Sequence, residues 1–185
     1  MVKQNSRASR HLGNVRILTF SAVLVAMSIV CGKYLAFGVG NVLRFSFENL
    51  PIMLGGIMFG PIVGAAIGIG ADLIGCILVG YAINPLITLG AAVIGILSGI
   101  LWRLMSRSPH SLAVISTTAI CHTVGSVLIK TFGLAVYYDM PVYALMLWRL
   151  LNYLIVGAIE CLLLYFILKN KSVRSMMARH SDRKD

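Results

Sequence analysis

"NVLRFSFENLPIMLGGIMFGPIVGAAIGIGADLIGC", residues 41–76, is an almost wholly apolar stretch that is rich in glycine. Its only charged residues are Arg44, Glu48 and Asp72. An ionisable side chain at the centre of a membrane helix costs about 2.5–3.5 kcal/mol on insertion scales, so such residues tend to face a bundle interior or a wet cavity. The stretch therefore predicts membrane-embedded helices that keep polar groups between them.

The composition of the whole chain excludes a water-soluble globule. Hydrophobic residues make up 58% of the 185 residues and charged residues only 12%, whereas a soluble domain is about half apolar and about a quarter charged. Backbone groups in lipid must be hydrogen-bonded locally, and the alternating strands of a membrane barrel are absent. The sequence therefore predicts an all-α integral membrane protein.

Apolar runs of about 20 residues, the length that spans a bilayer, predict a compact bundle of six transmembrane helices. Their approximate bounds are 17–37, 43–59, 62–79, 85–105, 112–136 and 142–168. Gly60 and Pro61 mark a tight turn between the second and third helices, because proline cannot continue the preceding helix. A cleaved signal peptide is the alternative for the first run, but the run is long and no small-residue cleavage site precedes a soluble domain.

The basic residues predict the orientation in the membrane. All but four of the 16 lysines and arginines lie in the leader, in the connection between the fourth and fifth helices, or in the tail. Short loops rich in these residues remain cytoplasmic. We therefore expect a basic cytoplasmic segment at 1–16, a six-helix transmembrane domain at 17–168 and a basic cytoplasmic tail at 169–185. The net charge of +10 then reflects topology and anionic lipid headgroups, with no need for nucleic acid.

Charged residues within the predicted helices indicate a binding site. Four basic and two acidic residues fall at the same outer depth of the bilayer: Lys33, Arg44, Lys130, Arg149, Glu48 and Asp72. Because such side chains avoid lipid, we expect them to line an outward-facing pocket of net positive character. A ligand that carries carboxylate or phosphate would suit this pocket.

Simpler roles exist for some of these residues. Arg44 and Glu48 are four residues apart and could pair with each other on one helix. The amine of Lys33 can reach the headgroups. Arg149 lies within a turn of Asn152 and too deep in the bilayer to reach the headgroups. We therefore expect both residues to line the pocket. Asp72 has no basic residue within a turn, so its partner is either elsewhere in the bundle or the ligand.

Aromatic and amide side chains gather at the same outer level. They are Phe37, Phe45, Phe47, Tyr81, Asn84, Tyr137, Tyr138, Trp148 and Tyr153. Individually, Tyr and Trp at a membrane boundary are typical interfacial anchors. Together they suit a flat heterocyclic ligand, with rings above and below it and amides or carboxylates at its edge.

The sequence contains no catalytic signature: GxSxG, P-loop and HExxH motifs are all absent, so we expect no enzyme. The four cysteines lack CxxC spacing, and His122 has no partner at metal-ligand spacing, so we expect no metal site. Glu160 either faces a partner helix or pairs internally. Small residues four apart on the predicted second to fourth helices indicate close helix packing, and Ala22 and Ala26 carry the same spacing on the first.

The run "LRFSFENLPIMLGGIMFGPIVGAAIGIGADLIG", residues 43–75, resembles the substrate-binding (S) components of energy-coupling factor (ECF) vitamin transporters. The segments "RFSFENLP", "GP" with the glycine-spaced helix that contains Asp72, and "NPLITLGAAVIGILSG" from Asn84 carry the resemblance. It covers nearly the whole chain. Within the family, the sequence is most similar to the folate-specific class.

The resemblance implies a high-affinity vitamin-binding subunit in a bacterial plasma membrane. Such a subunit works with a transmembrane coupling subunit and two ATPases, so ATP is used by the partners and this chain carries no cofactor. The family docks onto the coupling subunit through small residues on its first helix, which correspond here to Ala22 and Ala26. Riboflavin, thiamine and pantothenate remain alternative ligands, and a small autonomous channel or facilitator remains an alternative function.

Folate would match the residues named above. Asp72 and Asn84 are candidates to read the edge of the pterin, and Phe45, Tyr81 and Tyr137 to stack on its rings. The basic candidates for the carboxylates are Arg44, Lys130 and Arg149, through charge-assisted hydrogen bonds. The loop at 38–41 is the candidate for a movable lid.

Overall fold

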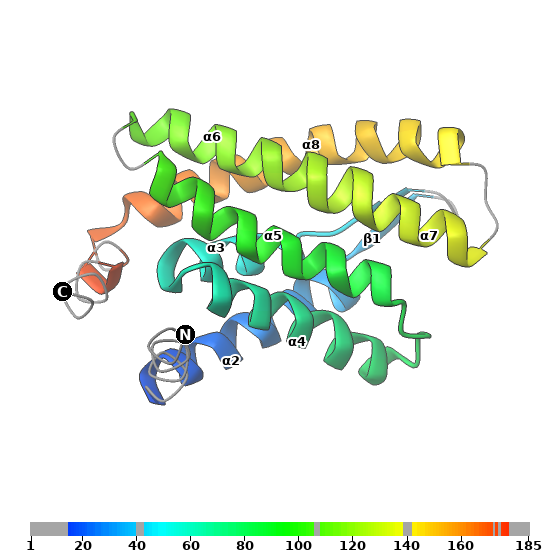
Figure 1. The fold of residues 1–185 in the computed structure, drawn as a ribbon, viewed down its shortest axis with the longest axis horizontal. Coiled ribbons are helices and arrows are strands. Elements are labelled where there is room, and N and C mark those ends of the chain that lie inside the picture. Colours follow the sequence, from blue (N-terminus) through cyan, green and yellow to red (C-terminus); the bar gives the residue numbers. More distant parts are fainter. Residues whose placement is uncertain are drawn as a thin grey trace, which may run out of the picture.

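The structure is a computed structural model, and it describes residues 15–39, 43–105, 108–138, 142–171, 173 and 175–177. Nearly all of this part of the chain is helical (Figure 1). The helices are α2 (Val15–Ile29), α3 (Asn49–Phe59), α4 (Pro61–Val79), α5 (Pro85–Leu104), α6 (His110–Cys121), α7 (Lys130–Tyr138) and α8 (Val142–Lys169), with π-helical segments η1 (Val30–Tyr34) and η2 (His122–Ile129).

The helix lengths confirm the prediction of a helical membrane protein. Among the described residues, five continuous helical stretches are long and apolar enough to cross a bilayer: Val15–Tyr34, Pro61–Val79, Pro85–Leu104, His110–Tyr137 and Leu145–Lys169. Many large apolar side chains of α8, such as Leu147, Leu154 and Phe166, are exposed. An exposed apolar surface of this extent is typical of contact with lipid or with another membrane protein.

The second helix differs from the sequence prediction. It begins at Asn49 instead of near residue 43, because Leu43–Phe45 forms strand β2, antiparallel to β1 (Phe37–Val39). Aromatic residues in this segment favour a strand, and Pro51 needs no N–H partner in the first turn of α3. With 11 residues, α3 extends only about 16 Å at 1.5 Å per residue. That is about half of the roughly 30 Å hydrocarbon core.

The predicted lid at 38–41 is only partly described. Gly38 pairs with Arg44 in the hairpin register, whereas residues 40 and 41 lie outside the described residues. In Figure 1 the hairpin lies near the end of the bundle where α7 finishes and α8 begins. The start of α2, the end of α5 and the end of α8 lie together at the opposite end. The hairpin and α3 therefore follow one another along the length of the bundle (Figure 1).

Small residues allow α4 and α5 to pack with their backbones in contact. A Cβ added to Gly64 would collide with the backbone of Gly95, and one added to Gly68 would collide with the backbone of Ala91. Because lipid provides no hydrophobic push between helices, such close approach supplies the packing energy. The predicted packing role of these small residues is confirmed, and α5 is held centrally between α4 and the α6–α7 row (Figure 1).

Candidate ligand-binding site

A buried ion pair joins Lys130 and Glu48. Lys130 Nζ lies 2.7 Å from Glu48 Oε1 and donates a second hydrogen bond to Asn49 Oδ1 at 3.1 Å. Lys130 begins α7 directly after η2, while Glu48 and Asn49 form the start of α3. A π-helical segment is an uncommon structure that often marks functional sites. The contact therefore ties two segments distant in the sequence to one buried ammonium group.

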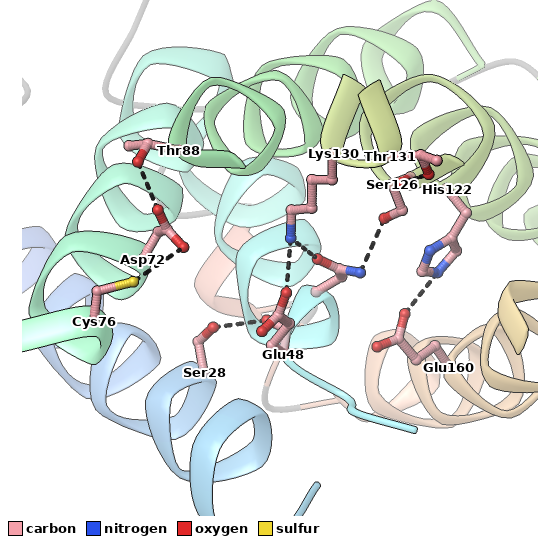
Figure 2. Close-up of polar contacts among 11 residues, drawn as sticks. Ser28, Glu48, Asp72, Cys76, Thr88, His122, Ser126, Lys130, Thr131 and Glu160 are labelled. Atoms are coloured by element: carbon pink, nitrogen blue, oxygen red, sulfur yellow. Dashed lines mark hydrogen bonds and ion pairs between the residues drawn. The ribbon is translucent and has the colours of Figure 1, made fainter. Parts of the chain in front are cut away.

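The ion pair is part of a longer polar network, shown in Figure 2. The Asn49 amide nitrogen donates to Ser126 Oγ at 3.2 Å, and Ser28 Oγ donates to the Glu48 backbone oxygen at 2.7 Å. Ser28 lies on α2 and Ser126 on η2. Buried polar groups in hydrocarbon need such partners. The network fixes the start of α3 against α2 and against the helix that carries Lys130.

Asp72 forms a second polar centre beside the ion pair. Thr88 Oγ1, on α5, donates to Asp72 Oδ2 at 2.6 Å. The sequence shows no basic residue within a turn of Asp72 on α4. The structure gives Asp72 a hydrogen-bond partner on another helix, Thr88 of α5. The Thr88 hydroxyl holds the carboxylate in one orientation and leaves Asp72 lining the same cavity as Lys130.

These groups enclose a small cavity at the centre of the bundle. Its lining residues come from α2, η1, the start of α3, α4, α5 and α7: Ser28, Ile29, Lys33, Glu48, Ile52, Ala71, Asp72, Ala91 and Lys130. The cavity measures about 10 Å³, which is room for about one water molecule. Pockets for small ligands are typically about 300–1,000 Å³. A vitamin can therefore bind here only after the lining residues move apart.

The charges around the cavity balance. The described lining residues include two cations, Lys33 and Lys130, and two anions, Glu48 and Asp72. The net positive character expected from the sequence is not found among them. The side chain of Arg44 lies outside the described residues, although its backbone belongs to β2. Because Arg44 lies in β2 and Glu48 in the turn before α3, the two residues are not on one helix, as the i, i+4 alternative required.

Three glycines make room for the charged side chains. A Cβ on Gly32 would lie 2.8 Å from Glu48 Cβ, one on Gly75 would lie 3.0 Å from Lys33 Cε, and one on Gly90 would lie 2.6 Å from Lys130 Cγ. Gly75 belongs to the small-residue series that the sequence assigns to helix packing. At this position its partner is a lysine side chain, so the glycine serves the polar site as well.

Several predicted site residues lie elsewhere. Asn84 is buried and caps α5: its Oδ1 accepts from the Leu86 N–H at 3.0 Å, while its Nδ2 donates to the Gly133 oxygen at 2.9 Å. Tyr81 is exposed, with Lys33 Nζ 5.3 Å from its ring centre. Phe45 is half-buried and Tyr137 is exposed. None of these four lines the cavity.

The two predicted site residues of α8 also lie outside the cavity lining. The Arg149 guanidinium carbon lies 5.8 Å from the centre of the Tyr153 ring, within range of a cation–π contact. Its Nη1 is buried without a hydrogen-bond partner among the described residues. Asn152 is buried one turn further along α8. Arg149 is half-buried, and its Nη1 retains capacity to donate a hydrogen bond to an anion.

Sequence reasoning missed the polar residues that hold the charged ones. Asn49, Ser126, Ser28 and Thr88 carry no charge and therefore do not stand out in an apolar helix. One signal was available, because Ser126 lies four residues before Lys130 and so near the same helix face. Asn49 and Thr88 become recognisable only when their partners, far away in the sequence, are placed beside them.

The sequence left open whether Glu160 faces a partner helix or pairs within the chain, and the structure places it beside His122. His122 Nε2 lies 2.7 Å from Glu160 Oε2, so Glu160 contacts a residue of its own chain. The His122 ring also packs 5.3 Å from the Tyr153 ring, centre to centre. His122 is buried, as predicted for a core histidine, and its contact with Glu160 is at ion-pair distance.

Ala22 and Ala26 lie on the outer face of α2. Both are exposed, whereas Leu24 and Ser28 on the same helix are buried. The two alanines are thus directed away from the helix's own bundle. Their small-residue spacing is available to lipid or to another transmembrane helix.

Comparisons with known proteins agree with this architecture. The family model for the substrate-specific component of ECF transporters matches residues 16–168. The folate transporter FolT of Clostridium novyi (strain NT) is 22% identical over 152 residues, which cover 82% of this chain and 87% of that protein. An uncharacterized protein of Mycoplasma pneumoniae, the MG313 homolog, is 37% identical over 68 residues, which cover 37% of this chain and 24% of that protein.

Among solved structures, the crystal structure of FolT bound with folic acid matches with a TM-score of 0.68 and 24% identity. The match covers 81% of this chain and 90% of the other. This likeness shows a shared fold. Together with the family match over most of the chain, it leads to one conclusion: this multi-pass membrane protein belongs to the substrate-specific components of ECF transporters.

Proposed function

We propose that the chain captures folate from outside the cell and delivers it through an ECF transporter. The observation that carries this proposal is the convergence of Lys33, Glu48, Asp72 and Lys130 on one internal cavity of a membrane bundle. Intramembrane charges are kept where they serve a site. The likeness to two FolT proteins, one of them bound to folic acid, supports folate as the ligand.

The chemistry of the residues fits folate, which has a flat pterin with donors on its edge and a tail with two carboxylates. Lys130 is the candidate for one carboxylate and Arg149 or Arg44 for the other, through charge-assisted hydrogen bonds. Asp72, oriented by Thr88, is the candidate acceptor for pterin N–H groups. Rings of Phe45, Tyr81 and Tyr137 are available for stacking once the cavity widens.

Topology and partners follow from the same proposal. We infer six passes with both termini in the cytoplasm of a bacterium, because the start of α2 and the end of α8 lie at one end of the bundle with the end of α5. The exposed face with Ala22 and Ala26 would contact the coupling subunit. Hydrolysis of ATP would belong to two partner ATPases, since the chain carries no P-loop.

A binding titration of the purified protein tests the ligand. Folate is added while tryptophan fluorescence is followed, and riboflavin, thiamine and pantothenate are added in parallel. We expect saturable quenching by folate below micromolar concentration and none by the other vitamins. Saturation by one of the others would replace folate. Folate uptake into liposomes that hold this chain alone would instead indicate an autonomous facilitator.

A further inference from the structure

Lys130 and Glu48 differ in how deeply they are buried. The side chain of Lys130 is 3% exposed and that of Glu48 is 27% exposed. A buried ammonium cannot remain without an anionic partner at acceptable cost, whereas the Glu48 carboxylate is partly exposed. When the pair separates, Glu48 is therefore the partner that leaves.

Glu48 also differs from the other charged residues of the cavity in its place in the fold. Lys33, Asp72 and Lys130 lie within helical segments, whereas Glu48 lies in the turn between β2 and the first residue of α3. Its backbone is held by the Ser28 hydroxyl, and its Cβ packs over Gly32. A rotation about the side-chain bonds of Glu48 changes no helix backbone and moves Oε2 away from Gly32 of η1. The residue best able to widen the cavity is thus the one that neutralises Lys130.

We propose that Glu48 is the resting partner of Lys130 and a specificity-determining residue: a carboxylate of the ligand replaces it on the ammonium group. The inference rests on the proposed function, since it concerns the same site. In this inference Glu48 does not bind the ligand directly. Glu48 competes with the ligand, and its displacement opens a cavity that otherwise holds about one water molecule.

The exchange explains how a cavity of balanced charge can select an anion. A ligand that brings its own carboxylate conserves the charge pair on Lys130 when Glu48 leaves. A neutral ligand of the same shape would leave a buried, unpaired ammonium, which is strongly unfavourable. Selection therefore operates through the penalty on the wrong ligand as much as through contacts with the right one.

The test compares Glu48→Gln with Asp72→Asn in full-length protein by calorimetric titration. The ligands are folate, the anionic vitamin pantothenate, and a neutral pterin without the glutamate tail. Glu48→Gln removes the competing charge and keeps the shape, so we expect at least tenfold tighter binding of the carboxylate ligand. Asp72→Asn is the matched control, because Asp72 lines the cavity but pairs with Thr88, and we expect no tightening there.

The outcomes separate this inference from the folate assignment. If pantothenate binds instead of folate and Glu48→Gln tightens it, the folate assignment fails and the inference holds. Weaker or unchanged binding of the carboxylate ligand in Glu48→Gln overturns the inference, and so does binding of only the neutral pterin or of no ligand. The double variant Glu48→Gln/Lys130→Gln should lose the gain, since the replaced ammonium no longer attracts the anion.

Discussion

His122 Nε2 lies 2.7 Å from Glu160 Oε2, and both side chains are almost completely buried. By hydrogen-bond geometry, none of the four side-chain nitrogen and oxygen atoms of the pair has a partner among the described residues, so the contact between them is one of ion-pair distance. Each residue is therefore the main polar partner of the other. In a low-dielectric interior, removal of one partner leaves the other buried without a polar partner, which costs its full desolvation free energy.

This pair predicts strong coupling between two substitutions. His122→Ala and Glu160→Ala should each destabilise the protein, whereas the double variant should lose less than the sum. We expect a coupling free energy of about 0.5–3 kcal/mol, the range for residues in direct contact. Thermal unfolding in detergent, followed for all four forms, measures it. Additive losses would show that the two side chains do not support each other.

Gly90→Ala should weaken both folding and ligand binding. An added Cβ would lie 2.6 Å from Lys130 Cγ and 3.0 Å from the Gly125 backbone oxygen, and overpacking of this kind costs about 1–3 kcal/mol. Gly70→Ala is the matched control, since its Cβ would meet only Val25 at 3.5 Å. The unfolding midpoint and folate affinity of both variants are compared. Equal effects would remove the special role of Gly90.

The charged residues of the cavity lining could be predicted from the sequence, because charge in an apolar helix is conspicuous. Lys130, Asp72 and Glu48 were found in this way, and all three line the cavity. Which groups pair could not be predicted. Glu48 bonds a residue 82 positions away, whereas helical periodicity offers only neighbours within a turn. The helical i, i+4 geometry expected for Arg44 and Glu48 does not occur, because Arg44 lies in β2 and α3 begins only at Asn49.

The fold, like the site, has features that the sequence predicts and features that it does not. Long apolar helices follow from composition, but the hairpin 37–45 lies within an apolar run that length alone assigns to two helices. Its aromatic content was the available signal. Asn84 is a comparable case, since an asparagine before proline at a helix start is a typical N-cap. Its cap bond to Leu86 was readable from the sequence, whereas its bond to Gly133 was not.

Thr88→Val should weaken folate binding about tenfold, which corresponds to about 1.4 kcal/mol. The Thr88 hydroxyl donates to Asp72 Oδ2 at 2.6 Å, and a hydrogen bond to a charged group contributes about 1.5–3 kcal/mol. Without it the carboxylate loses its fixed orientation toward the pterin edge. Thr88→Ser keeps the hydroxyl and should bind normally. If calorimetry gives wild-type folate affinity for Thr88→Val, the orientation of Asp72 does not contribute to folate binding.

Arg149→Ala should weaken folate binding by about ten- to a hundredfold, because a charge-assisted hydrogen bond to a carboxylate is lost. The Nη1 of Arg149, buried and without a hydrogen-bond partner in the described part of the chain, motivates this expectation. Arg103→Ala, at the last turn of α5, is the control and should leave affinity unchanged. If fluorescence titration gives the same affinity for Arg149→Ala as for the wild type, Arg149 has no place in the site.

Replacement of Ala22 and Ala26 by leucine should impair assembly with the coupling subunit and leave folate binding intact. Both alanines are exposed on α2, and bulkier side chains would keep a partner backbone from close approach. Ala66→Leu, also exposed but on α4, is the control for added bulk on the membrane face. Co-purification of the coupling subunit and ATPases with each variant is the measurement, with folate titration of the isolated chain beside it. Normal assembly of the double leucine variant would place the partner contact on another face of the bundle, and lost folate binding would show that the change had disturbed the fold.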